Sequence, residues 1–333
     1  MSRKKIAILA GGDSGEYEVS INSGNVVQNS LDKEKYEAYL IIFQGSNWFC
    51  EIHDQKYFID KNDFSLLIDD EKIRFDCVFI AIHGTPGEDG KVQGYLEMMN
   101  IPYSTSDWIV SALTFDKRYS KAVVELFGIL QADTLYFQKG DHDIKNKIIK
   151  ELGVPCFLKP NKGGSSVGIS RVMRNEELDE AIRVAFREDD EILAEEYIQG
   201  TEITCGVIRY KEQLIVMPLT EIVSKNDFFD YEAKYTKGMA DEITPARVAP
   251  EIEKECKILS SYLYNQLNCK GIVRFDYIFN EKGMFFLEAN TIPGLSEASI
   301  VPQEAEEMGI SRGELFEMAI EDALYRKEAG GRE

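Results

Sequence analysis

The sequence predicts an α/β domain followed by an α+β region, and three observations lead to this prediction. A short apolar run at 5–10 leads into the glycines of 11–15 and then into a helical pattern over 19–31. This is the strand, turn and helix entry of an α/β domain. A second apolar run, 75–82, also ends in a glycine-rich loop. From residue 155 onward, short strands and hairpins replace this alternation.

Length and composition bound the class of protein. A chain of 333 residues exceeds what one hydrophobic core normally serves, so we expect two or three domains with a cleft between them. The residues are 44% hydrophobic and 29% charged, and no apolar run reaches the roughly 18 residues of a membrane helix. The 58 acidic residues outnumber the 38 basic ones, giving a net charge of −20. This balance argues against a nucleic-acid or anionic-membrane partner.

The start of the chain and its cysteines are typical of a cytoplasmic protein. The basic first residues resemble a signal peptide, but a short apolar run follows them without a cleavage pattern. We therefore expect a buried first strand instead. The 6 cysteines form no C-x-x-C pair, as expected of reduced, buried thiols.

Glycine-rich loops follow the first two predicted strands, at 11–15 and 83–90. In open α/β sheets, ligand groups gather beyond the carboxyl ends of the strands. We therefore expect both loops to face one site, although they lie far apart in the sequence. The next segment, 107–127, is predicted to form one helix with Ser106 or Asp107 as its N-cap.

The remaining chain is predicted to hold strands and helices around one irregular segment. Residues 226–247 have aromatic and charged side chains, little aliphatic content and no period, which is typical of a lid or a disordered connection. The C-terminal helix begins with the capping-box pattern of Ser311 and Glu314. The other expected strands are 156–160, 192–197 and 202–210, and the other expected helices begin near 175 and span 250–267.

A glycine- and serine-rich turn at 162–168 is a candidate phosphate site. Its glycines let backbone N–H groups approach phosphate oxygens without hindrance from a Cβ atom. Lys159, just upstream on a strand, and Lys117 are candidate partners of the same phosphates. Alternatively, the turn is an ordinary hairpin tip and Lys117 a solvated helical lysine. The connector 195–202 offers a carboxylate to ribose and backbone groups to adenine, or else is an acidic surface linker.

A predicted hairpin at 274–290 combines a candidate magnesium site with a fixed cation. Asp276, Glu288 and Asn290 offer hard oxygen donors, which suit Mg²⁺ that bridges nucleotide phosphates. Arg274 beside them suits an anion that develops during a reaction. The alternative is an ordinary hairpin with a polar face towards solvent.

In this order and spacing, the motifs closely resemble those of the D-alanine–D-alanine ligases of the ATP-grasp superfamily. They are GGDSGEYEVS at 11–20, HGTPGEDG at 83–90, GSSVG at 164–168, YEAKY at 231–235, RFD at 274–276 and LEANTIPG at 287–294. The resemblance covers roughly 5–325 and implies a Rossmann-like parallel-sheet domain followed by a two-lobed ATP-grasp fold. The domains implied are 1–105, a small lobe at 106–197, and a C-terminal lobe at 198–333 with the metal site and a lid at 226–247.

The resemblance also implies roles for individual residues. ATP is expected to contact Lys117, Lys159, Ser166, Val167, Glu195, Ile198 and Glu202. Two Mg²⁺ or Mn²⁺ ions are expected at Asp276, Glu288 and Asn290. The catalytic groups implied are Glu16, Ser165, Tyr235, Arg274 and Gly294. The groups that bind the amino acids are expected to be His83, Lys234, Ser299 and Ile300.

The activity implied is ATP-dependent ligation of two D-alanines through a D-alanyl phosphate, for peptidoglycan precursors. A cytoplasmic homodimer is expected from the same resemblance. The alternative within the family is a ligase that joins D-alanine to D-lactate or D-serine. Tyr235 favours D-alanine, because relatives that accept D-lactate tend to carry another residue there.

Two alternatives lie outside this activity. One is a nucleotide-binding regulatory protein that has lost catalysis, against which the intact set of Arg274, Asp276, Glu288 and Asn290 argues. The other is an NAD-dependent oxidoreductase. The loop at 11–15 lacks the G-x-G-x-x-G order that such an enzyme needs.

Overall fold

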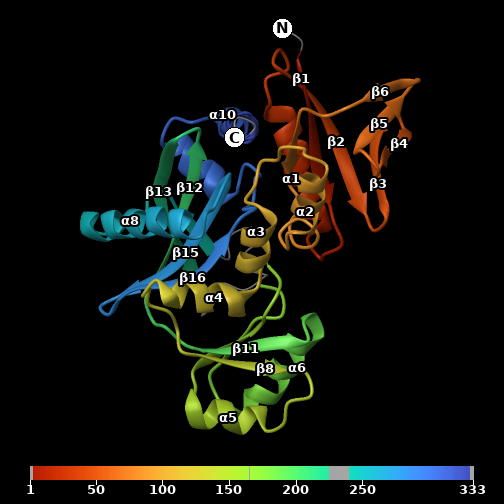
Figure 1. The fold of residues 1–333 in the computed structure, drawn as a ribbon. Coiled ribbons are helices and arrows are strands. Elements are labelled where there is room, and N and C mark those ends of the chain that lie inside the picture. The colour runs from red at the N-terminus through yellow and green to blue at the C-terminus, as the bar shows by residue number, and fades with distance from the viewer. Residues whose placement is uncertain (1–2, 165, 225–239, 331–333) are drawn as a thin grey trace.

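Three β-sheets and the helices around them make up the fold (Figure 1). The structure is a computed structural model that describes residues 3–164, 166–224 and 240–330. Within these residues, the mixed architecture of a parallel sheet followed by antiparallel sheets confirms the predicted fold class.

The first sheet has the strand order β6-β5-β4-β3-β2-β1-β7. Its centre is parallel, because β1 pairs in parallel with both β2 and β7, and its β3–β6 side is antiparallel. Helices α1 and α2 follow the two predicted glycine-rich loops. The strands are Lys4–Gly11, Tyr36–Gln44, Asn47–Ile52, Gln55–Asp60, Ser65–Ile68, Glu71–Ile73 and Cys77–Ile80, and α1 and α2 are Tyr17–Ser30 and Lys91–Met98.

The middle lobe is a four-stranded sheet in the order β10-β9-β11-β8, with its own small core. In Figure 1 it lies below the rest of the molecule, with α5 and α6 on one face of the sheet. Its strands β8–β11 are Thr134–Gln138, Cys156–Pro160, Ser170–Val172 and Glu191–Glu196. Its helices are α5 at Ile144–Glu151, the 3₁₀ turn at Asn175–Glu177 and α6 at Leu178–Glu188.

The third sheet is antiparallel and has the order β14-β13-β12-β15-β16. The expected hairpin at 274–290 is confirmed as β15 and β16. The strands β12–β16 are Thr201–Tyr210, Gln213–Ser224, Ala240–Ile243, Ile272–Asn280 and Gly283–Asn290. The helices around this sheet are α3 at Trp108–Phe115, α4 at Lys117–Leu126, α8 at Pro250–Gln266, α9 at Ile300–Glu307 and α10 at Arg312–Gly330.

The prediction of one helix over 107–127 was wrong, because two helices meet at Asp116. This residue has an extended backbone, with ψ 105°, and its side chain accepts a hydrogen bond from the Tyr119 N–H. It therefore ends α3 and caps α4, while Asp107 caps α3 by accepting from the Val110 N–H. Both helices pack on the core of the third sheet. The predicted domain boundary at residue 106 groups α3 and α4 with the middle lobe, and the domain boundaries remain predictions.

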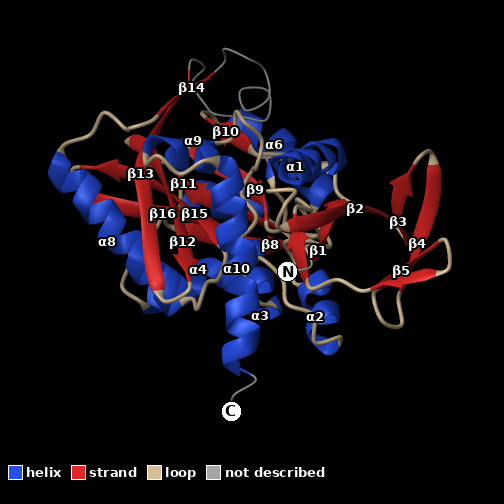
Figure 2. Cartoon of the chain, turned by 90° about the horizontal axis from the view of Figure 1, so that it is seen from above, coloured by secondary structure: helices blue, strands red, loops and turns tan. Residues whose placement is uncertain are grey.

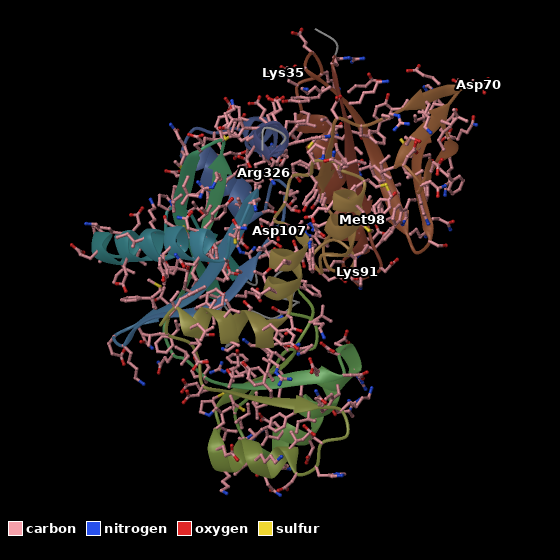
Figure 3. The ribbon with its side chains drawn as sticks, viewed as in Figure 1. Lys35, Asp70, Lys91, Met98, Asp107 and Arg326 are labelled. Carbon is pink, nitrogen blue, oxygen red and sulfur yellow. The ribbon has the colours of Figure 1, made fainter. Side chains whose placement is uncertain are left out.

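Helix α10 joins the third sheet to the first. Its apolar residues share one core with β1 and β7, in which Phe316 lies edge-on to Phe79 with ring centroids 5.7 Å apart. Arg326 of the same helix, which is labelled in Figure 3, donates to the Tyr103 carbonyl at 3.1 Å. Figure 2 shows α10 between the third sheet and the N-terminal strands. Helix α10 therefore packs against both sheets.

The predicted lid coincides only in part with described residues. Residues 225–239 lie outside them. Residues 240–243 form β14, an edge strand paired with β13, so the expectation of a segment without structure of its own was wrong for this part. Arg247 fixes the chain after β14 through an ion pair of 2.8 Å with Glu221.

Two expectations about composition can be compared with the fold. All six cysteines are free and buried, as predicted. Among the described residues, none of the helices is long and apolar enough to cross a membrane.

Candidate active site

The loops after β1 and β7 contact each other, as their positions after parallel strands predict. The Ser14 hydroxyl donates to the His83 carbonyl at 2.9 Å, and the Asp13 N–H donates to the Thr85 carbonyl at 3.0 Å. Gly12 has a φ of +105°, and a methyl group there would lie 2.7 Å from the side chain of Ile82. A glycine is therefore required at this close approach.

The carboxylate of Glu16 lies between two glycines from different parts of the chain. A methyl group built on Gly164 would lie 3.1 Å from its Oε2 atom, and one built on Gly84 would lie 3.3 Å from the same atom. The first loop of the N-terminal sheet thus reaches the glycine-rich turn of the middle lobe. Ser165 lies outside the described residues, as do Lys234 and Tyr235, so their predicted contacts are not described.

His83 is buried, and both of its ring nitrogens contact protein groups. Nδ1 lies 3.1 Å from the Ile292 carbonyl, and Nε2 lies 2.9 Å from the Ser23 hydroxyl. Because a carbonyl oxygen only accepts, Nδ1 carries the proton and Nε2 accepts from Ser23. Burial lowers the pKa of His83, which favours this neutral tautomer. His83 therefore connects the N-terminal sheet to the loop before Gly294.

The turn at 162–168 connects β9 to β10, and Lys117 reaches it from the start of α4. The Lys117 ammonium donates to the Gly163 carbonyl at 2.8 Å. Ser166 adopts a φ of +58°, and Val167 is exposed. Burial lowers the pKa of Lys117, against the opposing effect of Glu288. The structure thus brings the two predicted phosphate-binding features together.

Glu195 on β11 is held by two lysines inside the middle lobe. Its carboxylate forms an ion pair of 2.8 Å with Lys121 and a second, very short one with Lys159. Burial acts to raise the pKa of Glu195, but the two lysines outweigh it and lower the pKa. The side chains of Glu195 and Lys121 are only 6% and 7% exposed, so this triad is a buried charge network.

Lys121 is a site residue that the sequence analysis missed. It lies one helical turn after Lys117 on α4, so both point to the same side of the helix. A buried carboxylate on a strand needs a cation nearby, and this spacing was the available signal. Ile198 and Glu202 follow Glu195 at the passage from the middle sheet to β12 of the third sheet.

The hairpin of β15 and β16 places four polar residues side by side. Asp276 pairs across the strands with Glu288, and Arg274 pairs with Asn290. Residues two apart on a strand share a face, so all four belong to one face. Arg274 donates to both oxygens of Asp276 at 2.7 Å. The residue expected to stabilise an oxyanion, Arg274, and a candidate metal ligand, Asp276, thus form a bidentate ion pair.

The oxygen donors of this hairpin suit a hard cation. Two carboxylates, Asp276 and Glu288, directly oppose each other, an arrangement that is unfavourable unless positive charge lies between or beside them. Asn290 adds an amide oxygen, which also accepts from the Ile292 N–H at 3.0 Å. Among the described residues, no three His, Cys, Asp or Glu side chains form a metal cluster by themselves. Any ion here would therefore need Asn290 and substrate oxygens.

The chain after the hairpin folds back on itself before α9. The Ser299 hydroxyl accepts from the Ser296 N–H at 3.1 Å. A methyl group on Gly294 would lie 2.6 Å from the same hydroxyl, so this approach requires glycine. Ser299 is the residue before α9, and Ile300 is the first residue of that helix. Three of the predicted residues, Gly294, Ser299 and Ile300, thus lie in this loop and at the start of α9.

Glu88, in the second glycine-rich loop, is another residue that the sequence analysis did not assign. Burial and the nearby charge of Glu16 raise its pKa to about 8, while Lys117 and a Gly84 backbone bond act in the opposite direction. An acidic pair, Glu88 and Asp89, within a glycine-rich loop was the available signal. Together with Glu16, Lys117 and Glu288 it forms one electrostatically connected site.

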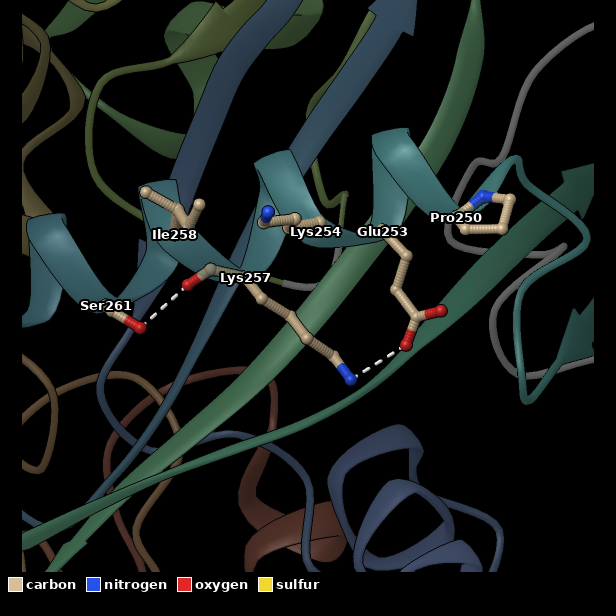
Figure 4. A pocket seen from close by; sticks show the side chains of 6 residues that line it. All are labelled: Pro250, Glu253, Lys254, Lys257, Ile258 and Ser261. Carbon is tan, nitrogen blue, oxygen red and sulfur yellow. Dashed lines mark hydrogen bonds and ion pairs between the residues drawn. The ribbon is translucent and has the colours of Figure 1, made fainter.

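A separate depression lies on the outer face of α8 (Figure 4). Its lining includes an exposed ion pair of 2.7 Å between Lys257 and Glu253. None of the predicted site residues that the structure describes lines it. The lining residues are Pro250, Glu253, Lys254, Lys257, Ile258 and Ser261.

Comparisons with known proteins agree over nearly the full chain. The family described as D-ala D-ala ligase N-terminus matches residues 5–106, and the one described as D-ala D-ala ligase C-terminus matches residues 122–321. A D-alanine–D-alanine ligase from Flavobacterium johnsoniae is 48% identical over 322 residues, which cover 96% of this chain and 99% of the relative.

Solved structures have the same fold. The VanG D-Ala:D-Ser ligase from Enterococcus faecalis has a TM-score of 0.86 at 32% identity, covering 97% of this chain and 100% of its own. A D-alanine–D-alanine ligase from Bacillus anthracis complexed with ATP has a TM-score of 0.80 at 32% identity, covering 99% and 100%. The shared fold, the two matched domain families and the relatives' identity establish that this chain belongs to the D-alanine–D-alanine ligase family, enzymes that use ATP to make D-alanyl-D-alanine for peptidoglycan.

Proposed function

We propose that this chain joins two D-alanines through a D-alanyl phosphate, and that the residues described above divide the work. A carboxylate is a poor acyl donor, so the first D-alanine must take the γ-phosphoryl group of ATP. The second D-alanine then attacks the acyl carbon as a free amine, a tetrahedral oxyanion forms, and phosphate leaves. The convergence of Glu16, the 162–168 turn and the β15–β16 hairpin, from three different sheets, is the observation that supports this proposal.

On the nucleotide side, Lys117 and Lys159 neutralise charge on the transferred phosphoryl group. Ser166 and Val167 cover the phosphates, and Ser165 belongs to the same turn. Glu195 and Ile198 meet the adenine, while Glu202 meets the ribose. The contact of Lys117 with the Gly163 carbonyl supports this division, because it holds the ammonium at the turn.

Asp276, Glu288 and Asn290 would hold two Mg²⁺ or Mn²⁺ ions. Bound there, the ions supply Lewis-acid stabilisation of the phosphate oxygens. The facing carboxylates of Asp276 and Glu288 support this assignment. The part of Arg274 is to stabilise the oxyanion together with the Gly294 N–H.

Glu16 receives the ammonium group of the first D-alanine. His83 lies near the first D-alanine, and its neutral ring holds the 292–294 backbone in place through the Ile292 carbonyl. Ser299, Ile300 and Lys234 bind the second D-alanine, and Tyr235 links the lid to Glu16 and Ser165 in a hydrogen-bonded trio. Because water hydrolyses an acyl phosphate, closure of the 226–247 segment over the site protects the intermediate.

The intermediate can be tested by trapping. Hydroxylamine attacks an acyl phosphate at carbon, so the enzyme with ATP, Mg²⁺ and D-alanine should form D-alanyl hydroxamate and phosphate. Omission of ATP or Mg²⁺ should abolish both products. Dipeptide formation without any hydroxamate at saturating hydroxylamine would contradict the acyl phosphate.

D-serine is the second candidate acceptor, because the VanG D-Ala:D-Ser ligase is 32% identical to this chain. Competition of D-alanine against D-serine and D-lactate at neutral pH, with products identified by mass, decides between them. We expect D-alanyl-D-alanine to dominate. The variant Tyr235→Phe should loosen the selectivity between an amine and a hydroxyl acceptor. Identical product ratios in variant and parent would refute that role.

We also propose a cytoplasmic homodimer. The use of ATP and D-alanine as substrates supports the cytoplasmic location. The family resemblance supports the homodimer. Sedimentation equilibrium at micromolar concentration should give twice the chain mass of 37.9 kDa. A single-chain mass across the concentration range would refute the dimer.

A further inference from the structure

Glu304, on helix α9, is a fully buried carboxyl group that none of the roles above uses. Its Oε1 atom accepts from the hydroxyls of Thr204 at 3.2 Å and Thr220 at 3.1 Å. Its Oε2 atom accepts from the Gly206 N–H at 2.8 Å. A buried carboxyl group without partners is costly, so these three bonds from β12 and β13 fix the position of the side chain and of the helix that bears it.

Two of the partners of Glu304 lie on β12, opposite Asp276 and Arg274 of the proposed active site. In the register of β12 with β15, Thr204 pairs with Asp276 and Gly206 pairs with Arg274. A methyl group on Gly206 would lie 2.5 Å from Oε2 of Glu304, so the strand has room for this carboxyl group only because residue 206 is glycine. Glu304 therefore holds α9 against the part of the sheet that also positions Arg274 and Asp276.

The same contacts continue to the end of β14. Thr220, which binds Glu304, lies 2.7 Å from the hydroxyl of Thr244. At its N-terminal end, α9 begins with Ile300, directly after Ser299. Glu304 is one helical turn beyond Ile300, so a shift or rotation of α9 moves both residues of the proposed acceptor site.

We propose that Glu304 is a positioning residue for the acceptor D-alanine: it anchors α9 so that Ser299 and Ile300 hold the attacking amine at the correct distance from Arg274. The inference rests on the proposed binding of the acceptor at Ser299. Hydroxyl groups both donate and accept. A glutamine can therefore bond to the same partners: its amide oxygen accepts from the Gly206 N–H, and its amide NH₂ donates to the hydroxyls of Thr204 and Thr220. Glutamine should replace glutamate here, whereas leucine should not.

The experiment compares Glu304→Leu, Glu304→Gln and the parent enzyme in dipeptide formation and in hydroxylamine trapping. Leucine removes the acceptor that two buried hydroxyls and one N–H share, and Thr220 keeps only its contact with Thr244. We therefore expect the acceptor KM to rise about tenfold or more. The KM for ATP and the rate of hydroxamate formation should stay within about twofold of the parent. Glutamine should restore the acceptor KM. This split distinguishes positioning from a general loss of structure.

Two controls match the substitution. Glu307→Leu makes the same change on the exposed side of α9, and Asp322→Leu makes it at a buried carboxyl group on α10. Neither should change the acceptor KM, although Asp322→Leu should lower the melting temperature. If Glu304→Leu does not fold, Thr220→Val keeps the carboxyl group, removes one partner and should raise the acceptor KM in the same direction.

The outcomes separate this inference from the proposal on which it rests. If Ser299→Ala raises the acceptor KM but Glu304→Leu or Thr220→Val does not, Glu304 has no positioning role. If the Glu304 variants lower hydroxamate and dipeptide formation in parallel, the role is merely structural. If Ser299→Ala itself leaves the acceptor KM unchanged, the proposed acceptor site is wrong.

Discussion

The nucleotide side and the acceptor side of the site are held together by different kinds of interaction. On the nucleotide side, Lys121 and Lys159 clamp the buried carboxylate of Glu195. On the acceptor side, Glu304 is held by two hydroxyls and one N–H. Charge positions the part of the site that is proposed to bind ATP, and hydrogen bonds position the part that is proposed to bind the acceptor amino acid. Each side should therefore respond to its own substitutions.

The largest effect is expected where the two sides meet, at Glu288. The variant Glu288→Gln removes a charge from the proposed metal site and should lower ligation by roughly 10³-fold, since stabilisation by a metal ion amounts to several kcal/mol. The fold should stay intact. Glu281→Gln, at the exposed turn of the same hairpin, is the matched control and should be fully active. Near-normal turnover of Glu288→Gln in a Mg²⁺-dependent phosphate assay would remove the metal assignment.

Arg274 should have the next largest effect. Arg274→Ala removes the proposed hydrogen-bond donor to the oxyanion and should lower turnover on the order of 10²-fold. It also leaves Asp276 buried without its bidentate partner, so the melting temperature should fall. Arg274→Lys keeps the charge but loses the paired geometry, and should be intermediate in turnover. An unchanged rate in Arg274→Ala would exclude it from the mechanism.

A substitution of Lys121 tests the proposed nucleotide side without changing the acceptor side. Lys121→Met leaves the buried charge of Glu195 with one lysine, which should cost on the order of 3 kcal/mol in unfolding free energy. The ATP KM should rise about tenfold through the displaced Glu195. Lys139→Ala breaks an exposed ion pair of the same lobe with Asp190 and should change stability by less than about 1 kcal/mol. Equal urea midpoints for the two variants would contradict the buried triad.

The smallest effect is an opposite pH dependence of the two sides. The pKa of Glu195 is lowered in the folded state from 4.5, so its contribution to stability is present above about pH 4.5 and is lost as pH falls further. Burial raises the pKa of Glu304 well above 4.5. Its contribution is therefore complete below about pH 4.5 and is lost as pH rises.

Unfolding curves across pH check this contrast. Lys121→Met should reduce the loss of stability in acid, because Glu195 then has a less depressed pKa. Glu304→Gln cannot ionise, so its stability relative to the parent should improve as pH rises from about 4.5. Parallel pH profiles for both variants and the parent would contradict the assignment of charge states.

How far the sequence predicts this site depends on whether the partners of a residue are close in the chain. The sequence predicted that Asp276, Glu288 and Asn290 lie close together, because a hairpin brings near neighbours together, and the pairing of β15 with β16 confirms this proximity. Lys121 and Glu304 were missed because their partners lie in distant strands, and buried position is not visible in a local pattern. The resemblance to a family added roles for single residues that spacing alone left open.

The fold shows the same limit. The first strand, the two glycine loops and the capping box at Ser311 and Glu314 were predicted from local signals and are confirmed. The break between α3 and α4 was missed, because the side chain of Asp116 caps a helix within an otherwise helical pattern. The edge strand β14 was missed because its pairing with β13 supplies the order that its own sequence lacks.

The measurement that tests the contrast most directly is a two-substrate kinetic analysis of Lys121→Met and Glu304→Leu, run side by side with ATP and D-alanine each varied. The account predicts that Lys121→Met raises the ATP KM and leaves the acceptor KM within about twofold, while Glu304→Leu does the reverse. Parallel shifts of both constants in both variants would contradict the separation of the site into a charge-held nucleotide side and a hydrogen-bonded acceptor side.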